Sequence, residues 1–130
     1  ADQGHSDAQY DLGKCYWFGW GVKKNLQKAI ELFQRAADQG HSDAQYDLGK
    51  CYWFGWGVKK NLQKAIELFQ LAADQGDLHA QHNLGLFYFK GEGVEKNLQK
   101  AIELFQRAAD QGHSDAQFNL ALCYFKGEGV

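Results

Sequence analysis

The stretch KNLQKAIELFQRAADQG at residues 24–40 recurs unchanged at residues 96–112 and with one substitution at residues 60–76. The starting positions 24, 60 and 96 give a period of 36 residues. Its apolar side chains have the i, i+3, i+4, i+7 spacing of one helix face, and they are Leu26, Ala29, Ile30, Phe33, Ala36 and Ala37. Asn25 is a typical N-cap and Gly40 a typical C′ residue. The stretch therefore predicts helices at roughly residues 25–38, 61–74 and 97–110.

A second apolar stripe precedes each of these helices. In the first repeat its members are spaced i, i+4, i+7 and i+8, and they are Ala8, Leu12, Cys15 and Tyr16. The stripe predicts a first helix in each repeat, at roughly residues 6–18, 42–54, 78–90 and 114–126. Capping boxes of Ser and Gln mark three of the starts, at Ser6/Gln9, Ser42/Gln45 and Ser114/Gln117. The third of these helices starts with Asp77 or with a poorer cap, and Gly19 and Gly21 predict a tight reversal between the two helices of a repeat.

Pairs of short helices with one apolar face each must stack on their neighbours to form a continuous core. The repetition predicts an all-α solenoid of about three and a half 36-residue helix-turn-helix repeats, a single domain over residues 1–130. Its units are residues 5–40, 41–76, 77–112 and a partial 113–130. Gly13 lies inside a predicted helix, where glycine is unfavourable, so we expect a neighbouring helix close to it, with small residues such as Ala29, Ala36 and Ala37.

Composition excludes several classes of protein. The formal charge of −2 comes from 14 basic and 16 acidic residues, and no basic stripe follows the repeats, so no nucleic-acid partner is expected. The longest apolar run, residues 15–22, is too short to span a bilayer, and no secretory leader is visible, so no membrane partner is expected. The sequence contains no Met and starts and stops within the repeat pattern, which is typical of a piece of a longer protein.

The repeat resembles a known family. The pattern that carries the resemblance is Ala8, Leu12-Gly13, Tyr16, Gly19-x-Gly21-Val22, Lys28-Ala29, Phe33, Ala36-Ala37 and Gly40. It is similar to the Sel-one-like repeat, a 36-residue relative of the tetratricopeptide repeat. The resemblance implies a right-handed superhelix with first helices on the concave wall and second helices on the convex wall. It also implies adaptor and scaffold functions and, as a rule, no catalysis.

Some secreted members of that family carry a paired cysteine in each unit, whereas this chain has only Cys15, Cys51 and Cys123. Clamps of that type cannot form, because each cysteine lies in a first helix and no second helix contains one. We interpret these thiols as small buried apolar side chains, with a metal or redox function as the less favoured alternative. They are compatible with a reducing compartment, and the sequence leaves the localisation unknown.

By register with the tetratricopeptide groove, the resemblance implies a protein-binding wall on the first helices. Tyr10, Lys14 and Trp17 share one helical face there because they are spaced i, i+4, i+7. The corresponding candidates in the later repeats are Tyr46, Lys50, Trp53, His82, Phe89, Phe118 and Phe125. Large aromatic side chains dominate binding hot spots. Three interpretations stay open for this aromatic ladder: core packing between helices, a peptide or protein groove, or self-association.

Trp20 and Trp56 form a second candidate surface. The third and fourth repeats have Glu92 and Glu128 at the same position, and a position that accepts Glu is expected to be exposed. Two tryptophans there predict an exposed apolar patch on the first two repeats, and such patches mark interfaces.

Catalytic, metal and cofactor sites find little support in the sequence. His5-Ser6-Asp7 has the residue types of a triad, but adjacent residues at a helix start cannot align as nucleophile, base and orienting group. His79 and His82 are spaced i, i+3, yet no further ligand of suitable spacing completes a metal set, so a groove or surface pair is the favoured interpretation. We therefore expect no enzyme activity, no cofactor and no metal.

The sequence thus predicts a non-enzymatic scaffold that binds a protein or peptide along an aromatic concave surface. The alternative is a structural protein whose repeats stack end to end into a filament, because neither end carries a polar capping repeat.

Overall fold

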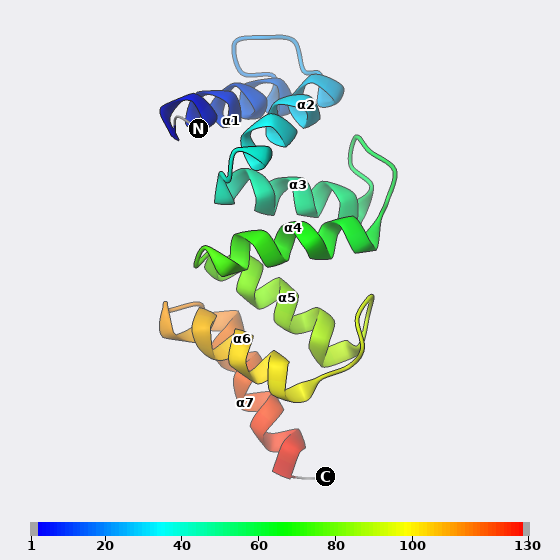
Figure 1. Ribbon diagram of the computed structural model, residues 1–130, viewed down its shortest axis with the longest axis vertical. Coiled ribbons are helices and arrows are strands. Elements are labelled where there is room, and N and C mark those ends of the chain that lie inside the picture. The colour runs from blue at the N-terminus through cyan, green and yellow to red at the C-terminus, as the bar shows by residue number, and fades with distance from the viewer. Residues whose placement is uncertain (1–2, 129–130) are drawn as a thin grey trace. The chain divides into compact units, whose positions relative to one another are not determined.

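The repeats fold into helices only. The computed structural model describes the backbone of residues 3–128 and the side chains of residues 4–125, and within that range every regular element is an α-helix. The all-α prediction is confirmed. The helices are α1 (Gln3–Phe18), α2 (Leu26–Asp38), α3 (Ser42–Phe54), α4 (Leu62–Asp74), α5 (Leu78–Lys90), α6 (Leu98–Asp110) and α7 (Ser114–Glu128). Longer loops follow α1, α3 and α5, and short turns follow α2, α4 and α6 (Figure 1).

The chain divides into two compact units, residues 1–72 and 73–130, with the boundary inside α4. In the first unit α1 packs on α2 and α2 packs on α3. In the second unit α5 packs on α6 and α6 packs on α7. Within each unit, therefore, first and second helices alternate, and the core lies along their contacts.

The predicted stripe of the second helices forms most of this core. In α2 the side chains of Ala29, Ile30, Phe33, Ala36 and Ala37 are buried as predicted, whereas Leu26 is only partly buried and Leu32 joins the core. Burial of a large apolar side chain stabilises the fold by about 1.5–3 kcal/mol. The repeated phenylalanine, at positions 33, 69 and 105, is the largest buried side chain of this stripe.

The close approach predicted at Gly13 is present, but alanines are not the partners. A Cβ atom built on Gly13 would lie 2.8 Å from Cε1 of Phe33 and 3.3 Å from Cβ of Leu32. The missing side chain is therefore replaced by a phenylalanine ring of the second helix. The prediction of small matching residues was wrong because a planar ring edge fits the notch over a helical glycine.

The caps of the second helices are confirmed, but the capping boxes of the first helices are wrong. The side-chain oxygen of Asn25 accepts a hydrogen bond from the backbone N–H of Lys28, and Asn61 and Asn97 do the same in their repeats. The N-cap of α3, however, is His41, whose Nδ1 accepts from the backbone N–H of Ala44. His113 caps α7 in the same way, Asp77 caps α5, and Ser6 lies inside α1.

The glutamines assigned to those boxes have another function. Nε2 of Gln45 donates to the carbonyl oxygen of Ala37, and Gln81 and Gln117 donate to Ala73 and Ala109 in the same way. Gln45 and Gln81 are buried, so these bonds satisfy both a buried side chain and a helix-end carbonyl.

The first-helix stripe is buried in α3 but not in α1. Ala44 and Leu48 are fully buried in the core that includes Ala36 and Ala37 of α2. Their counterparts in α1, Ala8 and Leu12, are exposed, and 44% of Leu12 is accessible. The prediction of burial was wrong at these two positions because no helix of the described residues covers that side of α1.

Candidate protein-binding surface

The aromatic ladder of the first unit rests on the phenylalanines of the second helices. The rings of Tyr10 and Trp17 have centroids 5.6 and 6.1 Å from that of Phe33. In the next repeat Tyr46 and Trp53 lie 5.7 and 5.8 Å from Phe69. All four ladder side chains are half-buried. One side of each ring thus covers the core, so core packing accounts for part of the ladder.

The second unit repeats this arrangement once and then departs from it. His82 and Phe89 lie 5.9 and 6.4 Å from Phe105, and both are half-buried. The last pair of candidates, Phe118 and Phe125 on α7, has 66% and 77% of its surface exposed. The ladder positions therefore share one environment in three repeats and a different one in the fourth.

The two candidate lysines lie against the tyrosines of their own helices. Nζ of Lys14 is 4.7 Å from the ring centroid of Tyr10, and Nζ of Lys50 is 4.7 Å from that of Tyr46. Each ammonium group is also 3.8 Å from a carboxylate oxygen three residues earlier, on Asp11 and Asp47 respectively. These contacts hold the lysine stems along the rim of the aromatic surface. The Lys14–Asp11 pair, whose carboxylate is exposed, contributes little to stability.

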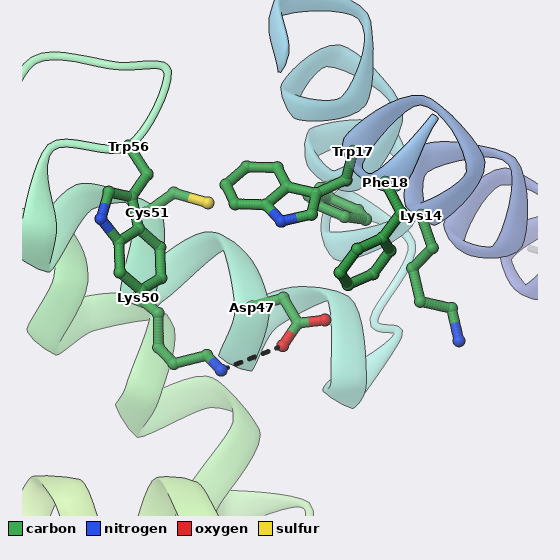
Figure 2. Close-up of a pocket in the computed structure, with 8 residues that line it drawn as sticks. Lys14, Trp17, Phe18, Asp47, Lys50, Cys51 and Trp56 are labelled. Atoms are coloured by element: carbon green, nitrogen blue, oxygen red, sulfur yellow. Dashed lines mark ion pairs between the residues drawn. The ribbon is translucent and has the colours of Figure 1, made fainter. Parts of the chain in front are cut away.

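A pocket of about 160 Å3 opens between the two repeats of the first unit. Its lining residues are Lys14, Trp17, Phe18, Phe33, Asp47, Lys50, Cys51 and Trp56. Figure 2 shows Trp56 on one side of the pocket, Trp17 and Phe18 on the other, and Asp47 with Lys50 below them. The indole rings of Trp17 and Trp56 are 6.2 Å apart, so the two predicted surfaces, ladder and tryptophan pair, meet in this pocket.

Asp47 is the one acidic group in the pocket lining. Its Oδ2 accepts a hydrogen bond of 2.5 Å from the hydroxyl of Tyr10. Burial raises the pKa of the Asp47 carboxyl, against the opposing effects of the Tyr10 hydrogen bond and of Lys50. The pKa of the Tyr10 hydroxyl is raised as well, by burial and by the neighbouring Asp47 carboxylate. This bond links α1 to α3, the two helices that supply most of the pocket lining.

Stacked aromatic pairs extend the pocket outward. Phe18 stacks on Trp20 with a centroid distance of 4.5 Å, and Phe54 stacks on Trp56 with a distance of 4.6 Å. All four side chains are exposed, Trp20 to 58% and Trp56 to 44%. We call Phe18, Trp20, Phe54 and Trp56 the aromatic patch. A shallower depression of about 510 Å3 adjoins it and shares Trp17 and Trp56 with the pocket.

Sequence reasoning missed Asp47 and Cys51 as members of this site. A usable signal for Asp47 was present, because a polar residue follows the tyrosine position of the ladder in every repeat, as Asp11, Asp47, Asn83 and Asn119. Cys51 shows no such signal. Burial raises the pKa of its thiol to about 12, so it is an apolar part of the wall at neutral pH. Cys123 is buried too, and Cys15 is partly buried.

The paired histidines of the third repeat belong to a larger cluster. The ring of His113 lies 4.6 Å from that of His82 and 5.3 Å from that of His79. Nε2 of His82 is 2.8 Å from Nδ2 of Asn119. The pKa of His82 is lowered, first by burial and then by the neighbouring His113. In the described part of the chain, no group of three or more His, Cys, Asp or Glu side chains is placed to hold a metal ion.

Solved structures of several repeat proteins resemble this fold. A Sel1 repeat protein from Oxalobacter formigenes has a TM-score of 0.91 and 35% identity over 96% of this chain. A protective antigen of uropathogenic Escherichia coli with an SLR fold has a TM-score of 0.89 and 37% identity over 94% of the chain. Cysteine-rich protein B of Helicobacter pylori has a TM-score of 0.75 and 27% identity, covering 90% of both chains. The chain spans 51% of the first of these proteins and 26% of the second.

A search of curated protein sequences found no match. None of the helices described here has the length and apolar character needed to cross a membrane. Sel1 repeat proteins generally serve as protein-interaction scaffolds and are generally not catalysts. The solved structures confirm the predicted repeat solenoid. The model of the Sel1 repeat family matches residues 6–41, 42–77, 78–113 and 114–130, and the chain therefore belongs to the Sel1 repeat family.

Proposed function

We propose that this protein is a non-enzymatic scaffold that binds a partner protein or peptide at the pocket and the aromatic patch of residues 1–72. The observation that carries the proposal is the pocket between Trp17 and Trp56, which opens onto exposed, stacked aromatic side chains. Monomeric proteins rarely expose such contiguous apolar surface without a binding function.

The size and lining of the pocket favour a peptide side chain as its occupant. A volume of about 160 Å3 is below the range of pockets that bind drug-sized molecules and suits one large apolar side chain. Trp17, Phe33 and Trp56 supply apolar contact, while Lys14 and Lys50 stand at the rim, where their ammonium groups can donate hydrogen bonds to carbonyl or carboxylate oxygens of the partner. A buried aromatic centre with a polar rim is the usual anatomy of a binding hot spot.

End-to-end stacking into a filament is the weaker candidate. Exposed apolar side chains on α1 and α7, such as Leu12 and Phe125, would favour it. Yet both helices are first helices, and in each unit a first helix packs on a second helix. Direct stacking of α7 on α1 of another copy would bring two first helices together and break this alternation.

The test is selection from a random peptide library on the whole chain, followed by titration of the selected peptide. All four tryptophans lie in residues 1–72, so intrinsic tryptophan fluorescence reports binding there. Two variants copy residues that the same fold already holds in later repeats, namely Trp56→Glu after Glu92 and Phe54→Lys after Lys90. We expect each to weaken binding at least about tenfold, as for hot-spot side chains.

The matched control is Leu71→Arg. Leu71 is another exposed apolar side chain, and arginine stands at its position in the first and third repeats. We expect this variant to bind like the unmodified chain. Equal loss in all three variants would show that binding depends on general apolarity, and no loss in the first two would refute the proposal.

A further inference from the structure

The junction between the third and fourth repeats contains a cluster of three histidines. His79 and His82 lie on α5, and His113 lies in the turn between α6 and α7. The ring of His113 stacks on that of His82 with a centroid distance of 4.6 Å, and the ring of His79 meets it edge-on at 5.3 Å. Protonation of this cluster therefore places like charges side by side.

Two hydrogen bonds at this junction need neutral histidines. Nδ1 of His113 accepts from the backbone N–H of Ala116 at 3.1 Å, which caps α7. Nε2 of His82 lies 2.8 Å from Nδ2 of Asn119 on α7, and because an amide nitrogen only donates, this ring nitrogen accepts. A protonated imidazole has two donors and no acceptor, so protonation removes both bonds.

The junction between the first and second repeats has the same layout but different charges. His41 caps α3 through Nδ1, and its Nε2 lies 2.8 Å from Oδ1 of Asp7. Its ring lies 4.7 Å from that of Tyr10, whose hydroxyl donates to Asp47. Two repeat periods later, the residues at the positions of Asp7, Tyr10, His41 and Asp47 are His79, His82, His113 and Asn119. Both carboxylates are thus absent from the later junction, and two further imidazoles take part in it.

One carboxylate still faces the histidine cluster, from the first turn of α7. Asp115 favours the charged form of His82, as does the side chain of Asn83. Burial, His113 and His79 disfavour that form, and burial has the largest effect. The pKa of His82 is therefore lowered, which means that the fold favours its neutral form.

The second helix α6 adds no charge next to His82. It presents the ring of Phe105, whose centroid is 5.9 Å from that of His82. The charged side chains near the end of α6 have other partners. Arg107 donates to a backbone carbonyl of α4, and Asp110 accepts from a glutamine of its own helix. The balance of charge at the junction thus rests on the histidines and Asp115.

We propose that the junction between α5 and α7 is a pH-sensitive joint, held while His82 and His113 are neutral and loosened in mildly acidic conditions when they are protonated. Loosening removes the cap of α7 and the bond to Asn119, and it adds repulsion between the stacked rings. Protonation of His41 is compensated at the earlier junction, because the charged ring forms an ion pair with Asp7. Histidine is the side chain whose ordinary titration range suits such a switch.

The test compares the two junctions within the unmodified chain. Amide hydrogen exchange followed by NMR gives protection factors, which are corrected for the intrinsic effect of pH, for residues 118–123 of α7 and 46–51 of α3. Between about pH 7.5 and 5.5, we expect those of α7 to fall by about fivefold or more, as for the loss of one cap, and those of α3 to change by less than about twofold. The ring signals of His82 should titrate over the same range of pH.

A variant that copies the first junction provides the matched control. It carries His79→Asp, His82→Tyr and Asn119→Asp, and in it the pH dependence of α7 should decrease to that of α3. An equal fall in α3 and α7 of the unmodified chain, protection of α7 that does not change with pH, or an unchanged pH dependence in the variant would each overturn the proposal. The comparison of α3 with α7 decides the question even where the variant does not fold.

Discussion

Replacement of Gly49 by alanine tests how tightly the two helices of a repeat pack. The new Cβ atom would lie 2.9 Å from Cε1, 3.0 Å from Cδ1 and 3.3 Å from Cζ of Phe69. Phe69 is fully buried, so its ring has no free space into which to move. Overpacking of this kind costs about 1–3 kcal/mol. The alanine regains about 0.5–1 kcal/mol because it is a better helix former than glycine.

The net expectation is a destabilisation of about 1 kcal/mol, which lowers the midpoint of thermal unfolding by about 3–5 °C in a chain of this size. Circular dichroism during heating measures it. In a Phe69→Leu background the clash is relieved, so the same Gly49→Ala change should become stabilising. A higher melting temperature for Gly49→Ala in the unmodified chain would refute the close packing inferred from the structure.

Three further predictions concern polar groups. Asp47→Asn should raise the free energy of unfolding at neutral pH, because burial raises the pKa of this carboxyl while the amide oxygen can still accept the Tyr10 hydrogen bond. Chemical denaturation of Asp47→Asn, with Tyr10→Phe for comparison, measures this free energy, and a large decrease in Asp47→Asn would contradict the prediction. The free energy of unfolding should fall as the pH drops below about 6.5, the ordinary pKa of histidine, because the pKa of His82 is lowered in the folded chain and the unfolded chain therefore binds more protons. Unfolding curves between about pH 5 and 8 measure this dependence on pH. His82→Gln should make the dependence weaker, and an unchanged dependence would count against the prediction. His41→Ala should lower the free energy of unfolding by about 1 kcal/mol because the N-cap of α3 is lost, whereas His41→Asn should retain most of the stability in the same denaturation assay. Equal stabilities of the two variants would show that the cap contributes nothing.

The repeat period and the second helices could be predicted because each repeat carries the same local signals. Asn25 and its two counterparts cap through their side chains as expected, and Phe33 occupies the centre of the apolar stripe. These features depend on residues within a few positions of one another. Local chemistry therefore determined what the sequence could predict about the second helices.

The first helices were predicted less completely because their contacts are made across repeats. The cap of α3 is His41, which also contacts Asp7 of the preceding repeat, with Nε2 and Oδ1 2.8 Å apart. Gln45 is buried, and its side-chain amide donates a hydrogen bond to the Ala37 carbonyl at the end of the preceding helix. Neither partner can be identified from spacing within one helix, so the capping-box pattern misled the prediction.

The candidate site, too, was predicted only in the part that depends on local sequence. Aromatic side chains on one face of a helix predicted the ladder, but only the fold shows that Trp17 and Trp56 from adjacent repeats enclose a pocket with Asp47. Phe118 and Phe125 share the ladder register yet stand exposed, because exposure depends on the helix packed opposite and not on the residue itself.

The most direct test of the proposed binding surface is a two-dimensional NMR titration of the 15N-labelled chain with a peptide selected on it. The four indole N–H signals all come from residues 1–72. We predict that the Trp17 and Trp56 signals move on binding, that signals of α6 and α7 stay in place, and that Trp56→Glu abolishes the effect. Shifts confined to residues 73–130, with all four indole signals unchanged, would contradict the account.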